Sequence, residues 1–215
     1  MISVILLMAG VGSRMNINQN KILLNLANKP VFMHSYDKFN KSGLEIICVI
    51  NPNDELEIKK HLDEDAIIVY GGSTRQESVY NGLLKCSGDY VLIHDAARPL
   101  ISEKLIEELI ENSKLGLPIL TYFKCKNTVK DISDGLKTLN RDNIIFAATP
   151  QCGMLDDFMY CHKKAIEDDF ISTDDISLIE KYLKKEIKLI ESNEENFKIT
   201  TKLDYDLAKL ILKEN

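Results

Sequence analysis

The sequence predicts an α/β protein of three layers, in which a mostly parallel sheet is covered by helices on both faces. Short apolar runs of strand length alternate with segments of helical periodicity along most of the 215 residues. Such alternation is typical of strands joined by helical crossovers. The length and the 45% hydrophobic fraction suit one domain with a substantial core, so residues 1–215 are expected to form a single domain.

Strands and helices follow one another regularly in the first half of the chain. Residues 3–8 are almost uniformly apolar, as in a strand buried on both faces. Further strands are expected at 45–50, 66–70, 90–94 and 118–123. Helices are expected at 30–39, 55–62, 75–86 and 103–113. In the last, apolar residues recur at i, i+1, i+4 and i+5, and Ser102 is placed to cap the helix.

The alternation breaks at residues 124–146, where the chain is largely polar. Two runs of alternating polarity flank Asp134-Gly135, a pair that favours a hairpin turn. A hairpin with so little apolar surface cannot bury itself, so we expect a protruding β-arm that leans on another subunit, with an exposed loop as the alternative. Beyond it, helices are expected at 155–167, 173–185 and 203–212, and a strand at 187–191.

Charge and cysteine content narrow the class of protein. A formal net charge of −6 argues against nucleic-acid binding as the main task. The five cysteines are odd in number and form no C-x-x-C pair, which argues against a zinc site and a disulfide framework. The first residues carry no basic region, and Arg14 follows too soon for a membrane span. We therefore expect a cytoplasmic protein without a membrane or nucleic-acid partner.

The N-terminal apolar run ends in a candidate phosphate-binding loop, AGVGSR (9–14), which Lys21 follows. Glycine lets backbone N–H groups approach an anion closely, and Arg14 and Lys21 supply positive charge. Neither the P-loop nor the dinucleotide pattern fits, because no Gly-Lys-Ser/Thr occurs and position 15 is Met15. The segment points to a nucleotide and a phosphoryl reaction; an ordinary turn with Arg14 in solvent is the alternative.

Two further motifs follow predicted strands. GGSTRQESVYNGL (71–83) exposes backbone groups suited to reading a base edge, although a glycine turn with a helix cap explains it equally well. HDAARP (94–99) places Asp95 at the carboxyl end of a strand, where ligands of parallel sheets bind and where Mg²⁺ with nucleotide phosphates is expected. The alternative there is an Asp–Arg pair that fixes the turn. His94 is as well explained by a structural role as by catalysis.

Taken together, the motifs resemble the 2-C-methyl-D-erythritol 4-phosphate cytidylyltransferase family over nearly the whole chain. The matching segments, in family order, are LMAGVGSRM with Lys21, GGSTRQESVYNGL, HDAARP, NTVK, Arg141 with ATPQ, STDDISLIE and NFKITT. The resemblance implies a Rossmann-like, glycosyltransferase-A-like nucleotidyltransferase. It implies transfer of CMP from CTP to the polyol phosphate with release of pyrophosphate, Mg²⁺ or another divalent cation, and a homodimer formed through the arm.

The resemblance also implies roles for single residues. Arg14, Lys21 and Lys198 match cations that stabilise charge on the α-phosphate. The positions that match the nucleotide site are Ala9, Gly10, Gly12, Ser13, Gly72, Ser73, Ser78 and Asp95, with Asp95 also as the metal ligand. The positions that match the substrate site are Arg98, Thr128, Lys130, Arg141, Thr149 and Thr173. Thr128, Lys130 and Arg141 lie on the arm, where the family binds the sugar phosphate across a dimer interface.

Some positions depart from the family pattern. Asn20 stands where a proline usually precedes the lysine, so a less rigid loop is expected. Ser73 occupies a position that is often acidic, and Asn127 replaces an aspartate. None of these departures removes a cation from the motifs.

The expected chemistry needs no activated side-chain nucleophile. A phosphate monoester is largely dianionic at neutral pH because its second pKa is about 6. Catalysis then reduces to aligning two anions and neutralising the transition state with Lys, Arg and Mg²⁺. The alternatives are a ribitol 5-phosphate cytidylyltransferase, a non-catalytic nucleotide-binding relative and, at the level of the fold, an NAD-dependent reductase.

Overall fold

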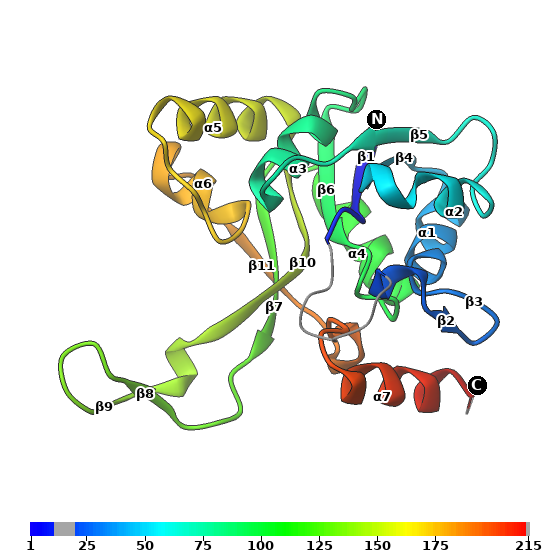
Figure 1. The fold of residues 1–215 in the computed structure, drawn as a ribbon. Coiled ribbons are helices and arrows are strands. Elements are labelled where there is room, and N and C mark those ends of the chain that lie inside the picture. The colour runs from blue at the N-terminus through cyan, green and yellow to red at the C-terminus, as the bar shows by residue number, and fades with distance from the viewer. Residues whose placement is uncertain (11–19, 214–215) are drawn as a thin grey trace.

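The computed structural model describes residues 1–10 and 20–213. Their main feature is a seven-stranded sheet in the order β11-β7-β10-β6-β1-β4-β5 (Figure 1). Its strands are β1 (Ile2–Leu7), β4 (Glu45–Ile50), β5 (Ile67–Tyr70), β6 (Tyr90–Asp95), β7 (Ile119–Lys124), β10 (Ile145–Met154) and β11 (Lys188–Glu191). Neighbouring strands pair in parallel except at β10, which is antiparallel to both β6 and β7. The expected mostly parallel sheet is therefore confirmed.

Helices cover both faces of the sheet. They are α1 (Val31–Lys41), α2 (Glu55–Lys59), α3 (Arg75–Leu83), α4 (Glu103–Ser113), α5 (Leu155–Glu167), α6 (Ile176–Tyr182) and α7 (Lys202–Lys213). Successive side chains of a strand point to opposite faces, and β1 shows the consequence. Val4 and Leu6 pack in a core with α1, α2 and α4, whereas Ile5 packs in a second core with α3, α5 and α6. This arrangement confirms the three-layer prediction.

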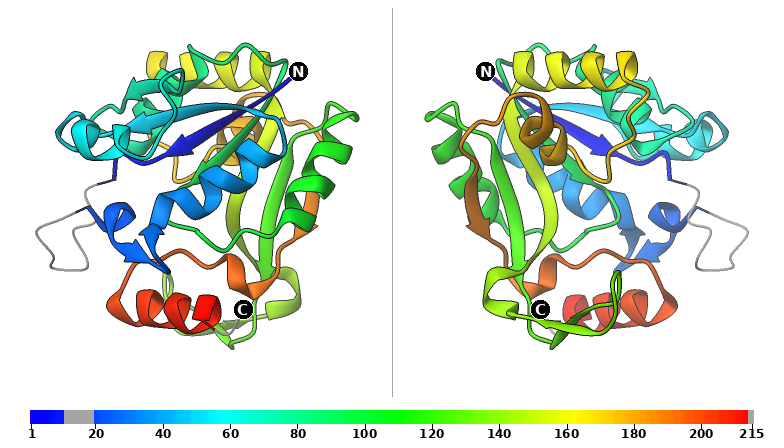
Figure 2. Two further views of the ribbon diagram at one scale, coloured as in Figure 1. Left: turned by 90° about the vertical axis from the view of Figure 1, so that its right-hand side faces the viewer. Right: turned by 90° about the vertical axis from the view of Figure 1, so that its left-hand side faces the viewer.

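A third, smaller core brings the two ends of the chain together. Leu26 and Val31 from the N-terminal part pack with Ile199 and Ala208 from the C-terminal part. The helix α7 accordingly lies beside the small hairpin of β2 (Asn25–Leu26) and β3 (Lys29–Pro30), as Figure 2 shows. This packing fixes the segment before α7 next to the carboxyl ends of β1 and β6.

The polar stretch at 124–146 forms the expected arm. It projects away from the body of the molecule beyond β7 and β10 (Figure 1). At its end β8 (Val129–Asp131) and β9 (Lys137–Leu139) pair antiparallel, with Gly135 at a φ of 78° in the turn between them. Ile132 and Leu136, beside the turn, are 80% and 77% exposed. The arm thus carries apolar side chains that its own chain does not cover.

Several boundaries differ from the predicted ones. The prediction contains no strand at 145–154, because ATPQCGM lacks both an apolar run and clear alternation. The helix expected at 173–185 begins only at Ile176, since Asp174 and Asp175 form the turn before it. Four short 3₁₀ turns complete the elements of the described residues: η2 (Lys21–Leu23), η3 (Pro52–Asp54), η4 (Arg141–Asn143) and η5 (Glu194–Asn196). Within the described part, no helix combines the length and the apolar character needed to cross a bilayer.

Candidate active site

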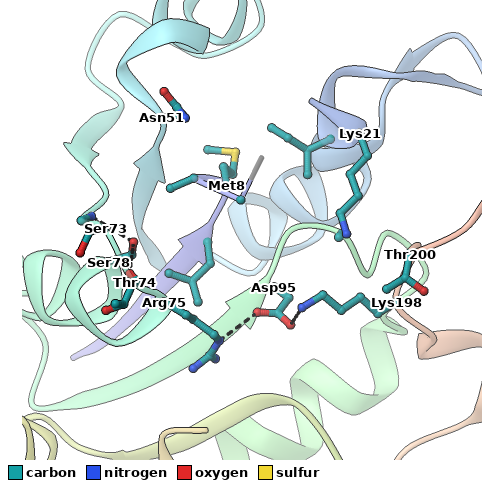
Figure 3. A pocket seen from close by; sticks show the side chains of 16 residues that line it. Met8, Lys21, Asn51, Ser73, Thr74, Arg75, Ser78, Asp95, Lys198 and Thr200 are labelled. Atoms are coloured by element: carbon teal, nitrogen blue, oxygen red, sulfur yellow. Dashed lines mark hydrogen bonds and ion pairs between the residues drawn. The ribbon is translucent and has the colours of Figure 1, made fainter. Parts of the chain in front are cut away.

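A pocket of about 420 Å³ opens at the carboxyl ends of β1, β4, β5 and β6. It is lined by Leu7, Met8, Ala9, Gly10, Lys21, Ile22, Asn51, Gly72, Ser73, Thr74, Arg75, Ser78, Asp95, Ala97, Lys198 and Thr200. Apart from Asn51, which follows β4, these residues come from or next to the three sequence motifs and from the C-terminal segment, which the fold brings to one edge of the sheet. Figure 3 shows Lys21, Asp95 and Lys198 directed into the same space.

The polar side chain of Asn20 fixes the residue before Lys21. Asn20 is buried, and its Nδ2 donates to the Met8 carbonyl oxygen at 3.2 Å and to Asp54 Oδ2 at 2.8 Å. Its Oδ1 accepts from the Ile22 N–H at 3.3 Å, which caps η2. Lys21 therefore enters the pocket from a short 3₁₀ turn tied to the end of β1. The expectation of a less rigid loop concerns residues 11–19, which lie outside the described part.

The turn between β5 and α3 forms a second wall. A Cβ added at Gly71 would lie 2.4 Å from Ala9 Cβ, so only glycine lets this turn approach the end of β1 so closely. Ser78 Oγ donates to the Thr74 carbonyl oxygen at 2.8 Å and accepts from the Gly72 N–H at 3.1 Å. Ser73 donates from its N–H and its hydroxyl to Glu77 Oε2, at 2.6 and 2.7 Å. The turn is thus shaped before any ligand binds.

Asp95 lies at the end of β6 between two cations. Lys198 Nζ donates to its Oδ2 at 2.7 Å, and Arg75 Nε lies 3.6 Å from its Oδ1 (Figure 3). Burial alone would raise the pKa of the Asp95 carboxyl, but the charges of Arg75 and Lys198 hold it well below its usual range. Asp95 is therefore an anion at neutral pH, and each of its oxygens faces a positive group.

Lys198 owes its place to the residue that follows it. The Ile199 N–H donates to the Ala97 carbonyl oxygen at 2.8 Å, and the Ile199 side chain is fully buried in the third core. Thr200 then donates from its N–H and hydroxyl to Asp204 Oδ2, each at 2.8 Å. These contacts hold the NFKITT segment against HDAARP, far away in sequence.

Two other predicted site residues, Thr149 and Arg98, lie with His94 behind Asp95 rather than in the pocket lining. Thr149 Oγ1 accepts from the Asp95 N–H at 3.2 Å and lies 3.1 Å from His94 Nδ1. His94 Nε2 lies 3.2 Å from the Arg98 carbonyl oxygen, which can only accept, so this nitrogen carries the proton. Arg98 Nη1 donates to the Asn196 carbonyl oxygen at 2.8 Å. Burial lowers the pKa of His94 to about 4, which fits a structural histidine.

The remaining substrate-site candidates are not brought to this pocket. Thr128, Lys130 and Arg141 are exposed on the arm, and Thr173 is exposed before α6. Lys130 Nζ donates to Thr138 Oγ1 at 2.6 Å, and Arg141 Nη1 donates to the Lys126 carbonyl oxygen at 2.9 Å. None of the described lining residues comes from the arm. Gly12, Ser13 and Arg14 lie outside the described residues.

The pocket carries an excess of positive charge. Among the lining residues that the structure describes, Lys21, Arg75 and Lys198 are cationic, and Asp95 is the only acid. Residues 1–10 and 20–213 contain no cluster of three His, Cys, Asp or Glu side chains that could hold a metal by themselves. The pocket is therefore suited to a polyanion, and a metal there would take most of its ligands from that polyanion.

Sequence reasoning missed Arg75 as a site residue. It belongs to the motif at 71–83, but an arginine in the first turn of a helix carries no signal of a specific contact. Asn51, Thr74 and Thr200 were missed as well, although Asn51 directly follows β4 and the two threonines lie inside predicted motifs. The useful signal was position, because side chains just beyond the carboxyl end of a parallel strand face the binding edge.

Comparisons with known proteins agree with this geometry. The family model described as 2-C-methyl-D-erythritol 4-phosphate cytidylyltransferase matches residues 2–214. Curated relatives of that name include one from Clostridium novyi, 38% identical over 97% of this chain and 95% of its own length. One from Aquifex aeolicus is 37% identical, with 99% and 98% covered. The crystal structure of a 4-diphosphocytidyl-2C-methyl-D-erythritol synthase from Anaerococcus prevotii superposes with a TM-score of 0.87 at 30% identity, covering 99% and 98% of the two chains.

Proposed function

This chain belongs to the 2-C-methyl-D-erythritol 4-phosphate cytidylyltransferase family, and from that premise we propose how its pocket works. The protein transfers CMP from CTP to 2-C-methyl-D-erythritol 4-phosphate and releases pyrophosphate, a step of non-mevalonate isoprenoid biosynthesis. The observation that carries the assignment of the pocket is its charge: Lys21, Arg75 and Lys198 line it together with Asp95, at the edge where parallel sheets commonly bind ligands.

The reaction is an in-line displacement at the α-phosphate of CTP. A phosphate oxygen of the acceptor forms the new P–O bond, and the bond to the β-phosphate breaks, so pyrophosphate leaves with the electron pair. The acceptor phosphate is already an anion at neutral pH. The protein therefore has to hold two anions together and stabilise the charge that builds on the α-phosphate oxygens.

We assign that stabilisation to Lys21 and Lys198, which enter the pocket from opposite ends of the chain. Lys198 now pairs with Asp95, and a bound triphosphate offers it a second anion at the same place. Arg14, outside the described residues, is proposed as the third cation. Gly10, Gly12 and Ser13 are proposed to wrap the triphosphate with their N–H groups.

The cytidine end of CTP is assigned to the wall formed by the β5–α3 turn. Ala9, Gly72, Ser73 and Ser78 are the proposed contacts, and Gly71 and Gly72 bring the backbone of this turn close to the end of β1. Ser73 and Ser78 already bond within the turn, so their hydroxyl groups are held in fixed positions. Fixed polar groups of this kind favour one base over another.

Asp95 is the proposed ligand for Mg²⁺ or another divalent cation. Mg²⁺ in nucleotide sites commonly takes one or two carboxylates and completes its shell with phosphate oxygens and water. A single ionised carboxylate beside a polyphosphate pocket fits that requirement. When bound, the cation would supply further neutralisation of the phosphates, and Asp95, which now pairs with Lys198, would help to hold it.

We propose that the sugar-phosphate end of the site is completed by a second copy of the chain. Arg98, Thr149 and Thr173 would contribute from the same copy as the pocket. Thr128, Lys130 and Arg141 would come from the partner's arm. In support of this, none of the described residues that line the pocket comes from the arm of the same copy. The exposed apolar side chains at the arm turn support burial against that partner.

A cytoplasmic location is part of the proposal. Its support is that Cys48, Cys86, Cys125, Cys152 and Cys161 are all free thiols. Reduced cysteines are typical of the cytosol, whereas secreted proteins tend to pair them.

The decisive experiment is pyrophosphate release from CTP with each of two acceptors. We expect 2-C-methyl-D-erythritol 4-phosphate to be turned over far faster than ribitol 5-phosphate, with an absolute requirement for a divalent cation. Faster turnover of ribitol 5-phosphate would overturn the acceptor. Binding of CTP without pyrophosphate release with either acceptor would overturn the enzymatic assignment.

A further inference from the structure

Arg75, which lines the pocket, forms an ion pair with the buried Asp175, and the proposed reaction assigns no role to this pair. Arg75 Nη2 donates to Asp175 Oδ2 at 2.7 Å, although the two residues are 100 positions apart. Asp175 is 1% exposed and does not line the pocket. The same guanidinium faces Asp95 Oδ1 from Nε at 3.6 Å. One cation therefore stands between two carboxylates, in hydrogen-bond contact with the buried one alone.

The backbone around Asp175 is fixed from two directions. Gln151 Oε1, on β10, accepts from the Asp175 N–H at 2.9 Å and from the Ile176 N–H at 3.0 Å. Gln76, next to Arg75 on α3, accepts from the Ser172 N–H at 2.9 Å. The turn before α6 is thus bonded both to the sheet and to the helix that carries Arg75, so Asp175 holds its arginine from a rigid position.

The unequal distances have an electrostatic consequence. A charged hydrogen bond at 2.7 Å holds Arg75 far more firmly than a separation of 3.6 Å does. If Asp175 were neutral, the guanidinium would be drawn to Asp95, the other anion within reach. Asp95 would then be paired by Arg75 as well as by Lys198, and less available to a ligand.

We propose that Asp175 is a positioning residue for Asp95: by binding Arg75 it keeps this guanidinium beside Asp95 without letting it pair fully with that carboxylate. The proposal rests on the role of Asp95 proposed above. Asp175 acts through Arg75 and touches neither CTP nor acceptor. The acidic turn of STDDISLIE thereby acquires a function distinct from that of Thr173.

The test is a double-mutant cycle of Asp175→Asn with Asp95→Asn. Single-turnover rates of pyrophosphate release are measured with enzyme in excess, so that slow variants stay measurable. In the native background, we expect Asp175→Asn to lower the rate about tenfold. In the Asp95→Asn background we expect a loss below about twofold, because no carboxylate is left for Arg75 to pair with.

Asp174→Asn is the matched control. Asp174 lies in the same turn and accepts from Gln151 Nε2 at 2.9 Å and from the Ser177 N–H at 2.9 Å. Its charge attracts Arg75 less strongly than that of Asp175 or Asp95, and no hydrogen bond between Asp174 and Arg75 occurs among the described residues. It should lower the rate by less than about threefold. Equal losses for the two turn variants would show that the turn matters only as structure and would overturn the proposal.

Two further outcomes separate this inference from the proposed function. Parent-like activity of Asp95→Asn would overturn the role of Asp95, and the positioning role with it. A large loss for Asp95→Asn together with an equal Asp175→Asn loss in both backgrounds would overturn the positioning role alone. If Asp175→Asn does not fold, Asp175→Ser, which also removes the charge but leaves Arg75 in place, replaces it in the cycle, and the same coupling to Asp95 is required of it.

Discussion

Lys21 is the described cation whose loss should affect the reaction most directly. It enters the pocket from η2 and is largely buried, so its apolar stem also packs. We expect Lys21→Met to lower kcat by roughly 10²–10³-fold, as the loss of one charge-stabilising group does in other enzymes. Steady-state kinetics with CTP and the acceptor measure this, and Lys104→Met on the exposed surface of α4 is the control. A parent-like kcat would remove Lys21 from the mechanism.

Asn20 should stabilise the fold as well as fix the position of Lys21. Asn20→Ala leaves the Met8 carbonyl and Asp54 without its donor, and we expect a loss of about 1–3 kcal/mol in the free energy of unfolding. Urea denaturation measures the loss. Asn20→Asp should be worse, because it faces Asp54 with a second carboxylate. Combining it with Asp54→Asn restores a donor and an acceptor, so recovery in the double variant is expected if the contact is the cause.

Two buried histidines should make stability depend on pH. Burial lowers the pKa of both His94 and His162 to about 4, from 6.5 in the unfolded chain. The unfolded state therefore binds more protons between these values, and stability falls as pH drops from about 6.5 towards 4. Each histidine contributes up to about 1.4 kcal/mol per pH unit in that window. Above about pH 6.5 each histidine is neutral in both the folded and the unfolded state, so it no longer makes stability depend on pH.

The variant His162→Phe isolates one of these contributions. Neither ring nitrogen of His162 has a hydrogen-bond partner among the described residues, and the ring stacks on Tyr80 with centroids 6.1 Å apart. Phenylalanine keeps the stack and removes the titrating group. Urea denaturation at pH 7.5, 6 and 5 should therefore show a shallower decline than in the parent. An unchanged decline would mean that His162 is not buried in its neutral form.

At the scale of elements, the β5–α3 turn depends on a glycine. Gly71→Ala places a Cβ 2.4 Å from Ala9 Cβ and 2.9 Å from Ser78 Oγ, so the turn must move away from β1. We expect a loss of about 1–3 kcal/mol in stability and a raised KM for CTP. Gly10→Ala is the stability control, since its added Cβ meets no atom of the described residues within 4 Å. Equal melting temperatures for the two variants would contradict this account of the turn.

The elements differ in how far the sequence could predict them. The uniformly apolar strand β1 and the helix α4, whose apolar residues lie on one face, follow from periodicity alone. The predicted bounds of both agree with the observed ones to within one residue. The sequence does not predict β10, because its side chains make specific polar contacts: Thr149 accepts from the Asp95 N–H, and Gln151 holds the turn before α6. A strand whose side chains are chosen for such contacts has no hydrophobic pattern of its own.

The same distinction holds within the candidate site. Asp95 and Lys21 could be predicted, since a strand end and a glycine loop mark them in the local sequence. Lys198 was placed through the family resemblance alone, because nothing local links it to Asp95, 103 residues away. The ion pair between Arg75 and Asp175 could not be predicted from the sequence, since it depends on how α3 and the turn before α6 pack.

At the scale of the whole molecule, the arm should determine both assembly and activity. Ile132→Glu with Leu136→Glu places charge on the two exposed apolar side chains of the arm turn. We expect this variant to be a monomer by light scattering and to lose most activity, since no partner completes the sugar-phosphate end. Leu56→Glu, equally exposed on α2, is the control. A fully active monomer would contradict the shared site.

Mixing two inactive variants tests the sharing directly. Arg141→Ala keeps the pocket and loses an arm contact, whereas Lys21→Met keeps the arm and loses a pocket cation. A mixed dimer then contains one site with both parts intact. Co-expression should therefore restore activity that neither variant has alone, and absence of restoration in a purified mixed dimer would place both residues in one subunit's site.

The attachment of Lys198 through Ile199 to Ala97 has a consequence for biosynthesis. In chain order, the described lining residues stop at Ala97 and resume only at Lys198 and Thr200. A growing polypeptide thus makes most of the described pocket early and receives Lys198 only much later in translation. Proteolytic clipping before residue 198 would likewise leave Asp95 with Arg75 alone, and the described lining would drop from two net positive charges to one. Intact synthesis of the tail is therefore what gives the pocket its final charge.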